Sequence, residues 1–192
     1  VDVVVAPPPS AVDPDDSVAA RIAEHVAAQA DGFVYGRGGR DLFQVARDIL
    51  TAGCQKLALA ESCTGGWLAK TFTDTPGSSR FLECGIVTYS NAAKSAYLGV
   101  DPALLEAHGA VSEPVCRAMA QGVKSRSGVD WALAVTGIAG PEGGSAEKPV
   151  GTVFIGLAGP SGTEVSRFSF GGDREQVRWR TAVKAAELLW RA

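Results

Sequence analysis

Short apolar runs alternate with amphipathic segments along most of this chain, from residue 41 onward. Apolar runs of this length between turn residues are typical of strands buried in a sheet, and apolar residues at helical spacing indicate helices. The predicted strands are 56–61, 83–90, 130–136, 150–158 and 163–170. The predicted helices are 41–52, 66–74, 91–98, 101–108, 113–127 and 173–191. The last two strands flank Gly159-Pro160-Ser161-Gly162, which indicates an antiparallel hairpin.

Strands that alternate with helices and end in a hairpin predict an α/β fold. We expect a mixed sheet covered by helices on both faces, which is a three-layer α/β/α sandwich. Asp41, Ser112 and Asp173 are suitable N-caps for three of the helices, and Gly53 follows the end of the first.

The chain divides into three stretches. Residues 1–16 are rich in Pro and Asp, which predicts an extended or disordered linker. Residues 17–40 are predicted to form a helix followed by a short edge strand at 32–36. Residues 41–192 form one domain with an ordinary globular composition, 46% hydrophobic and 20% charged over the whole chain. The chain begins with Val1 and its only methionine is Met119, which indicates a piece of a longer protein or a processed start.

Composition excludes several classes of function. The net charge is −3 and there is no long run of Lys or Arg, which argues against direct nucleic-acid binding. No apolar run reaches the ~18 residues that a membrane span needs. Four cysteines without CxxC spacing and two histidines argue against a metal site, and we expect no cofactor. Scattered cysteines of this kind are typical of reduced thiols, so we expect a cytoplasmic protein.

Ser62 is the first candidate for chemistry. It ends the apolar run 57–61, two glycines follow it, and a helix begins directly afterwards. Free N–H groups at a helix start attract anions, so the amides of Thr64, Gly65 and Gly66 are candidate donors to an oxyanion and Ser62 is a candidate nucleophile. The more common role of such a serine is an N-cap. Thr64 is an equally good cap, which would leave Ser62 free.

Tyr89 and Lys94 form the second candidate group. Tyr89 ends a predicted strand and Lys94 lies about one turn inside the next helix, so both can reach the same strand-end edge as Ser62. A neutral lysine can take a proton from a serine, and a tyrosine can relay it, provided that the lysine pKa falls below its usual value. The alternative is a solvated surface lysine, which describes most lysines.

The third candidate is the glycine-rich loop that follows the strand 130–136. Thr136, Gly137 and Gly140 begin it, and Lys148 lies near its end. Backbone amides in such a loop can hold a phosphate, and long loops in compact domains are often functional. The alternative is an ordinary flexible loop.

Arg174 is the fourth candidate. It lies in the first turn of the last helix, where a cation opposes the helix dipole, so its position suggests a role in binding phosphate or carboxylate. A plain surface arginine is the alternative. We assign Arg178, one turn further on, only to solvating that face. Glu61 is expected to support the Ser62 turn, and His108 to be structural.

These segments together resemble a known family. AESCTGG, VTYSNAAK, HGAVSEPV, TGIAGPEGGSAEKPVGTV and GGDR occur in that order. They are similar to the C-terminal domain of the competence/damage-inducible protein CinA, the nicotinamide-nucleotide amidase family. The resemblance covers roughly residues 40–192. Residues 32–36 also resemble the sequence that joins this domain to the upstream domain of full-length CinA.

The resemblance implies hydrolysis of nicotinamide mononucleotide (NMN) to nicotinic acid mononucleotide and ammonia. It implies that Ser62 is the nucleophile, that Lys94 and Tyr89 are base and relay, and that Arg174 belongs to the site. We assign the substrate phosphate to Arg174 and the loop 137–145, with Lys148 as a weaker candidate. The alternative function is a non-catalytic module that binds a nucleotide or regulates an attached domain.

Expected partners follow from the same resemblance. Besides NMN, we expect an upstream CinA domain in the full-length protein. Apolar side chains such as Trp67, Trp179 and Trp190 on predicted helices suggest a homo-oligomer. We expect no nucleic acid and no membrane as direct partners.

Overall fold

A computed structural model describes residues 17–30, 34–36 and 39–192. The chain separates into two units, Val1–Gly39 and Arg40–Ala192. In the first unit the predicted helix is confirmed as α1, Ser17–Gln29. Residues 34–36 have no regular secondary structure, so the predicted strand is wrong there, and the rest of it lies outside the described residues. The linker predicted at 1–16 also lies outside them.

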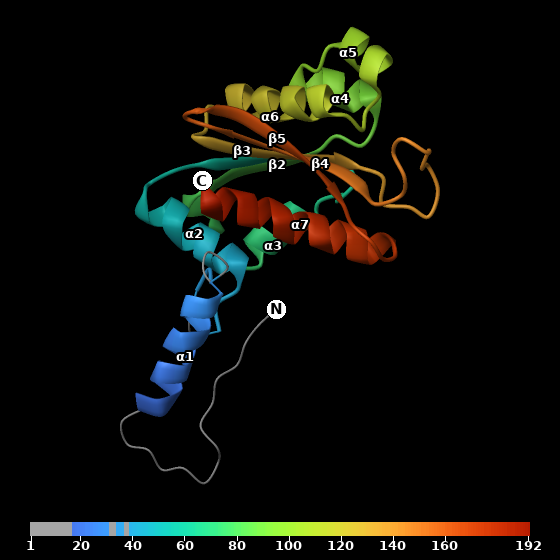
Figure 1. The fold of residues 1–192 in the computed structure, drawn as a ribbon. Helices are drawn as coiled ribbons and strands as arrows, with labels where there is room; N and C mark the ends of the chain where they lie inside the picture. Colours follow the sequence, from blue (N-terminus) through green and yellow to red (C-terminus); the bar gives the residue numbers. More distant parts are fainter. Residues whose placement is uncertain (1–16, 31–33, 37–38) are drawn as a thin grey trace. The chain divides into compact units, whose positions relative to one another are not determined.

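The second unit is built on a five-stranded sheet in the order β2-β1-β3-β4-β5 (Figure 1). β1 pairs in parallel with both β2 and β3, whereas β4 is antiparallel to β3 and β5. The predicted mixed sheet is therefore confirmed. The strands are β1 Leu57–Glu61, β2 Leu82–Val87, β3 Trp131–Gly137, β4 Thr152–Gly159 and β5 Gly162–Ser169.

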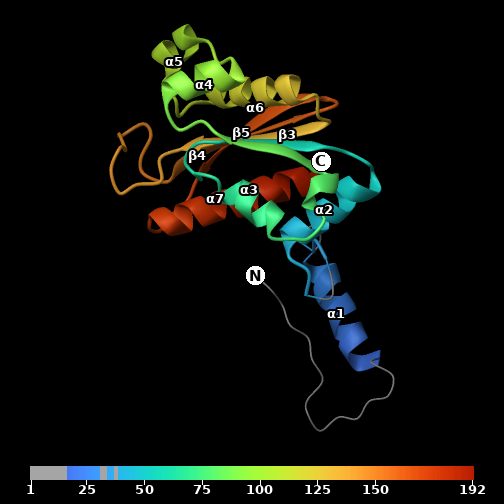
Figure 2. The ribbon, with the colours of Figure 1, turned by 180° about the vertical axis from the view of Figure 1, so that it is seen from behind.

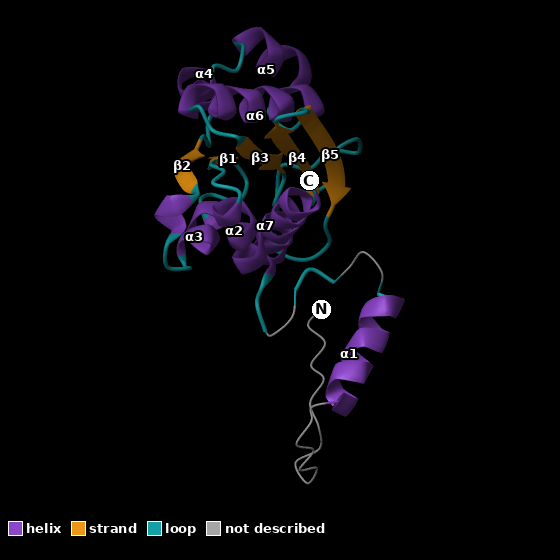
Figure 3. Ribbon diagram, turned by 90° about the vertical axis from the view of Figure 1, so that its left-hand side faces the viewer, coloured by secondary structure: helices purple, strands orange, loops and turns teal. Residues whose placement is uncertain are grey.

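Helices cover both faces of the sheet, which confirms the three-layer α/β/α sandwich (Figures 2 and 3). One face carries α2 Leu42–Ala52, α3 Trp67–Thr73 and α7 Arg174–Arg191. The other carries α4 Asn91–Leu98, α5 Pro102–His108 and α6 Glu113–Ser127. A short 3₁₀ turn at Ser78–Arg80 precedes β2 and was not predicted.

The connections on the two sides of β1 run in opposite directions along the sheet. The chain leaves β1 through α3 and enters β2 on one side, then returns through α4, α5 and α6 to β3 on the other side. The crossing helices lie on opposite faces of the sheet (Figure 3). Open α/β sheets bind ligands where the strand order reverses in this way, outside the carboxyl ends of the strands. Here that point is the residue after Glu61, which is Ser62.

Different side chains fill the two core layers. Ala58, Ala60, Ala132 and Ala134 pack in one cluster with Met119 of α6, so this helix lies close to the sheet. The opposite layer contains aliphatic side chains and a cluster of aromatic rings. The rings of Phe43 and Phe72 meet edge to face at 5.1 Å, and those of Phe72 and Phe81 at 5.8 Å. Such pairs stabilise a core beyond the area that they bury.

Two of the predicted helix caps are confirmed. Asp41 accepts a hydrogen bond from the Gln44 N–H, and Asp173 accepts one from Gln176, each within a complete capping box. Ser112 occupies the predicted N-cap position of α6, but its side chain does not cap the helix. Its hydroxyl donates to the Gly109 carbonyl instead and makes no capping bond.

No helix among the residues that the structure describes is long and apolar enough to cross a bilayer.

Gly122 supplies a direct test of how α4 and α6 pack. A Cβ at this position would lie 1.9 Å from the Leu98 carbonyl oxygen. Gly→Ala within a helix ordinarily stabilises by about 1 kcal/mol. We expect Gly122→Ala to destabilise instead, by about 1–3 kcal/mol, because α4 must move away. Urea denaturation measures this, with the exposed Gln121→Ala of the same helix as control. A Gly122→Ala protein as stable as the control would contradict the packing.

Candidate active site

Ser62 lies at the carboxyl end of the central parallel strand, β1. Its N–H donates to the Val135 carbonyl of β3 at 3.1 Å, which fixes its backbone against the neighbouring strand. The side chain is largely buried, with 8% of its surface exposed. Its Oγ lies 3.2 Å from Nζ of Lys94. The structure therefore brings together the candidate nucleophile and the candidate base.

Lys94 reaches Ser62 from the first turn of α4. Side chains in a helix point back toward its N-terminus, and this helix begins just after β2. Lys94 Nζ also donates to the main-chain carbonyls of Thr88 at 2.8 Å and Tyr89 at 3.3 Å. Only 1% of the Lys94 surface is exposed. The alternative of a solvated surface lysine is wrong.

Burial lowers the pKa of the Lys94 amine below its usual value of 10.5, because charging it removes an ion from water. Lys94 makes no ion pair with a carboxylate of the described chain to offset this cost. Its three contacts suit both protonation states. An ammonium can donate to all three oxygens, whereas a neutral amine can donate to two carbonyls and accept from the Ser62 hydroxyl. Such a group can take and return a proton without moving.

Glu61 holds the turn that carries Ser62. It is fully buried, and its carboxylate accepts from the N–H groups of Gly66, Leu68 and Ala69 at 2.9, 3.2 and 2.8 Å. A carboxylate at a helix N-terminus is favourable, so Glu61 caps α3. The structure thus supports the expected role of Glu61 in the turn. The expectation that Thr64 could be the cap is wrong, because its hydroxyl makes no capping bond.

The turn amides are not equally available to a ligand. The Gly65 N–H donates to the Ser62 carbonyl at 3.1 Å, and the Gly66 N–H is engaged by Glu61. Both residues have positive φ, +60° and +94°, a conformation that favours glycine. The N–H groups of Cys63 and Thr64 donate to no backbone carbonyl within the described part of the chain, and both lie beside the Cys63 thiol. The donors open to an oxyanion are therefore at 63 and 64 rather than at the predicted glycines.

Tyr89 takes a different place from the one expected for a proton relay. Its carbonyl accepts from Lys94, but its side chain is 61% exposed. The phenol oxygen accepts from Arg174 at 3.0 Å, and Arg174 also donates to the Gly140 carbonyl at 2.8 Å. Arg174 thus joins the end of β2 to the glycine-rich loop. In this arrangement the phenol of Tyr89 contacts neither Ser62 nor Lys94.

The expectation that Arg178 only solvates its helix face is wrong. Its Nε and Nη2 donate to the Thr64 carbonyl at 3.2 and 2.7 Å, and its guanidinium stacks over the Trp67 ring at 5.1 Å. The signal in the sequence was its spacing of four from Arg174, which places both side chains on one face of α7. The identity of the partner carbonyl could not be found from spacing.

Contacts with neighbouring segments hold both ends of the glycine-rich loop. The Thr136 hydroxyl donates to the Ala110 carbonyl at 2.8 Å, and a Cβ at Gly137 would lie 2.7 Å from the Val153 side chain. Lys148 Nζ donates to the His108 carbonyl at 3.1 Å. Gly140 is joined to Tyr89 through Arg174, and Thr136 directly follows Val135, whose carbonyl accepts from the Ser62 N–H. The direct contacts of Thr136, Gly137 and Lys148 are structural.

Two further polar groups beside Ser62 have no partner. The hydroxyls of Thr64 and Thr88 are buried and make no hydrogen bond in the described residues. Buried hydroxyls usually find partners, so these two are exceptions, and both lie beside the Ser62–Lys94 contact. No group of three His, Cys, Asp or Glu side chains in the described chain could hold a metal ion.

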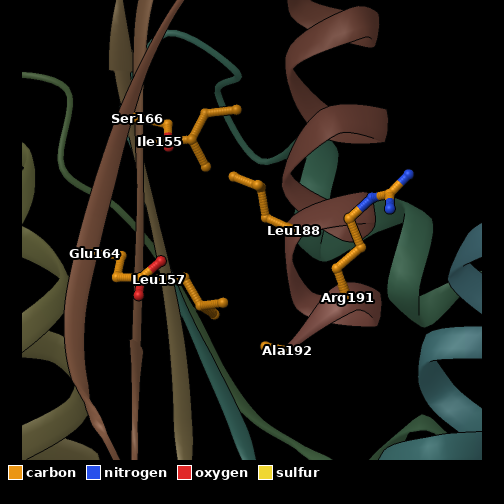
Figure 4. A pocket seen from close by; sticks show the side chains of 7 residues that line it. All are labelled: Ile155, Leu157, Glu164, Ser166, Leu188, Arg191 and Ala192. Carbon is orange, nitrogen blue, oxygen red and sulfur yellow. The ribbon is translucent and has the colours of Figure 1, made fainter. Parts of the chain in front are cut away.

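A separate groove lies at the far end of α7 from Arg174 (Figure 4). Ile155 and Leu157 of β4 face Leu188 across it, with Glu164 and Arg191 at its sides. None of the residues around the Ser62–Lys94 contact lines this groove. It therefore takes no part in the chemistry of the strand-end edge.

Replacing the Glu61 carboxylate tests the support of the turn. In Glu61→Gln an amide NH₂ must face one of three N–H donors, which leaves a buried donor unsatisfied. We expect a loss of stability of about 1–3 kcal/mol. The control is Glu83→Gln, whose carboxylate is exposed and lies 3.8 Å from Lys56. Chemical denaturation compares the two variants, and equal stability would contradict the capping role.

Comparison with known proteins agrees with this architecture. Residues 40–192 match the family model of the CinA C-terminal domain. A CinA-like protein of Anaeromyxobacter sp. strain K is 49% identical over 171 residues, which cover 89% of this chain and 42% of that protein. A CinA-like protein of Chlorobaculum tepidum is 52% identical over 166 residues, 83% of this chain and 39% of that one. The chain spans about two fifths of the length of these relatives.

Solved structures show the same fold. The competence/damage inducible protein of Agrobacterium tumefaciens has a TM-score of 0.74 and 40% identity, over 80% of this chain and 96% of that one. A CinA superfamily protein of Escherichia coli has a TM-score of 0.74 and 31% identity, over 85% and 98% of the two chains. The fold, the family model and the relatives agree, and the chain belongs to the CinA C-terminal domain family.

Proposed function

We propose that this domain hydrolyses a carboxamide, with Ser62 as nucleophile and Lys94 as general base. One observation carries the proposal. A buried lysine amine without a carboxylate partner lies 3.2 Å from a serine hydroxyl at the reversal point of an α/β sheet. A serine becomes nucleophilic when an adjacent base accepts its proton, and a desolvated lysine is such a base. An ordinary salt-bridged or solvated lysine could not serve.

The reaction follows from the contacts of Lys94. Ser62 Oγ attacks the amide carbon while its proton passes to Lys94 Nζ, which the carbonyls of Thr88 and Tyr89 then stabilise as an ammonium. The tetrahedral intermediate breaks its C–N bond as Lys94 returns the proton to the departing nitrogen, and ammonia leaves. Water attacks the resulting ester and gives one proton to Lys94, which passes it to the departing Ser62 oxygen. The carboxylic acid product leaves and loses the other proton to solvent.

We propose NMN as the substrate. Family membership supports this choice, and so does the charge at the mouth of the site. Arg174 and Arg178 lie one turn apart on α7, and neither pairs with a carboxylate in the described chain. The exposed Arg174 suits a phosphate, with the phenol of Tyr89 beside it. The contact between Arg174 and the Tyr89 phenol fits a shared role in phosphate recognition, and the relay role of Tyr89 stays a prediction.

A regulatory module that only binds a nucleotide is the rival function. Such a module would need Arg174 and Arg178 to bind the nucleotide, but it would not need a buried amine next to Ser62. Desolvating a lysine costs stability, and a binding site gains nothing from it. Ammonia release from NMN by the purified protein separates the two functions.

Ser62→Ala tests the nucleophile. The variant keeps the backbone bond to Val135, so we expect it to fold normally and to release ammonia from NMN at least 10³-fold more slowly, because no acyl-enzyme can form. Ser161→Ala, in the exposed turn between β4 and β5, should behave as wild type. Coupled ammonia detection measures both. Wild-type turnover by Ser62→Ala would exclude the nucleophile role.

The pH profile tests the base. The neutral amine is the active form, and burial lowers its pKa, so kcat/KM should rise with pH to a plateau with a midpoint below 10.5. Lys94→Arg cannot deprotonate in this range and should lose activity at every pH. The exposed Lys70→Arg is its control. An active Lys94→Arg enzyme would show that another group accepts the proton.

A further inference from the structure

A continuous line of hydrogen bonds runs from Arg178 to the amide beside the nucleophile. Arg178 donates twice to the Thr64 carbonyl. That carbonyl and the Gly65 N–H belong to one peptide group, and the Gly65 N–H donates to the Ser62 carbonyl at 3.1 Å. The Ser62 carbonyl in turn shares its peptide group with the Cys63 N–H. Two peptide groups therefore connect a cation to the Cys63 N–H.

The end of this line is open. The Cys63 N–H donates to no backbone carbonyl in the part of the chain that the structure describes, and its neighbour there is its own thiol. It is the amide immediately after the proposed nucleophile, so it lies next to the carbon that Ser62 Oγ would attack. The amides of Gly65 and Gly66 are already engaged and cannot replace it. Thr64 is the other open amide, and its own carbonyl is the acceptor that Arg178 holds.

Chains of hydrogen bonds polarise their members, by about 10–30% per bond. A guanidinium at one end draws electron density toward the Thr64 oxygen, which makes the Gly65 N–H a stronger donor. The same effect passes through the Ser62 carbonyl to the Cys63 N–H. A permanent cation is the suitable source, because a guanidinium keeps its charge at every working pH.

Arg178 is also held rigidly. Its guanidinium lies over the Trp67 ring, and that ring is 6.0 Å from the ring of Trp179 on α7. On the other side of the same turn, the Glu61 carboxylate accepts hydrogen bonds from N–H groups at the start of α3. The turn is thus fixed between a buried carboxylate and a stacked guanidinium, and the donor direction at residue 63 is fixed with it.

We propose that Arg178 is a positioning residue that fixes and polarises the Cys63 N–H as a donor to the oxyanion of the tetrahedral intermediate. The inference rests on the proposed amidase function and adds to it the origin of transition-state stabilisation. Arg178 itself contacts the Thr64 carbonyl and the Trp67 ring. It acts through the Thr64 carbonyl and two peptide groups, whereas Arg174 meets the substrate.

Steady-state kinetics of Arg178→Met with NMN test the proposal. Removing an oxyanion donor lowers kcat by about 10²–10³-fold. Arg178→Met keeps the Cys63 N–H but removes the guanidinium that polarises it, so we expect a smaller loss in kcat, roughly 10- to 100-fold. KM should stay within about twofold, because the interaction forms only in the transition state. Arg178→Lys keeps the cation without the double donation and should fall between Arg178→Met and wild type. Arg180 lies on the same helix as Arg178 and donates to the Gly171 carbonyl. Arg180→Met is therefore the matched control and should keep wild-type kcat.

Two readouts separate this role from a loss of structure. Pyridine-3-boronic acid forms a tetrahedral adduct with an active serine, and its affinity should fall in parallel with kcat. The affinity for nicotinic acid mononucleotide, which forms no adduct, should not change. The midpoint of the pH profile should also stay in place, because Lys94 is untouched. All assays are run well below the measured melting temperature of each variant.

Each contrary result has its own meaning. Wild-type kcat in Arg178→Met would overturn the inference and leave the amidase function intact. Equal losses of boronate and product affinity, or a moved pH midpoint, would overturn it as well, since Arg178 would then shape the whole site. A wild-type protein that releases no ammonia from NMN would overturn the proposed function and this inference with it.

Discussion

The buried amine of Lys94 and the hydroxyl of Ser62 form the contact on which the site depends. Burial lowers the pKa of Lys94, and the carbonyls of Thr88 and Tyr89 hold Nζ at the strand edge in either protonation state. This arrangement costs stability. Between the lowered pKa and 10.5 the unfolded state binds the proton more tightly, so this contribution to stability improves as pH rises through that window and is least favourable below it.

Opposite charges hold the turn that carries Ser62. Glu61 binds the N–H groups at the start of α3 from inside the sheet, and Arg178 binds the Thr64 carbonyl from α7. Neither group meets the other as an ion pair in the described structure. The Glu61 carboxylate and the Arg178 guanidinium each bind backbone groups instead. Both charges therefore orient the same short turn. That precision suits a reaction in which a donor must face a developing oxyanion.

Most of the fold could be predicted from the chain because its signals are local. The alternation of buried strands and helices gives the layers, and Asp41 and Asp173 cap the helices that they precede. The meeting of Ser62 with Lys94 was also predictable, since carboxyl ends of parallel strands share one edge. The cap on α3 was not predictable, because Glu61 reaches it from the preceding strand. The partner of Arg178 was equally hidden, since it lies 114 residues away in the sequence.

The state of Lys94 can be measured without substrate. Titration of the folded protein by ¹⁵N-detected NMR of lysine side chains gives the pKa of its Nζ, and the resonance missing from Lys94→Arg identifies the signal. The account predicts a Lys94 midpoint below 10.5. A Lys94 midpoint at or above 10.5 would contradict it, because the amine would then remain charged and could not accept the proton of Ser62.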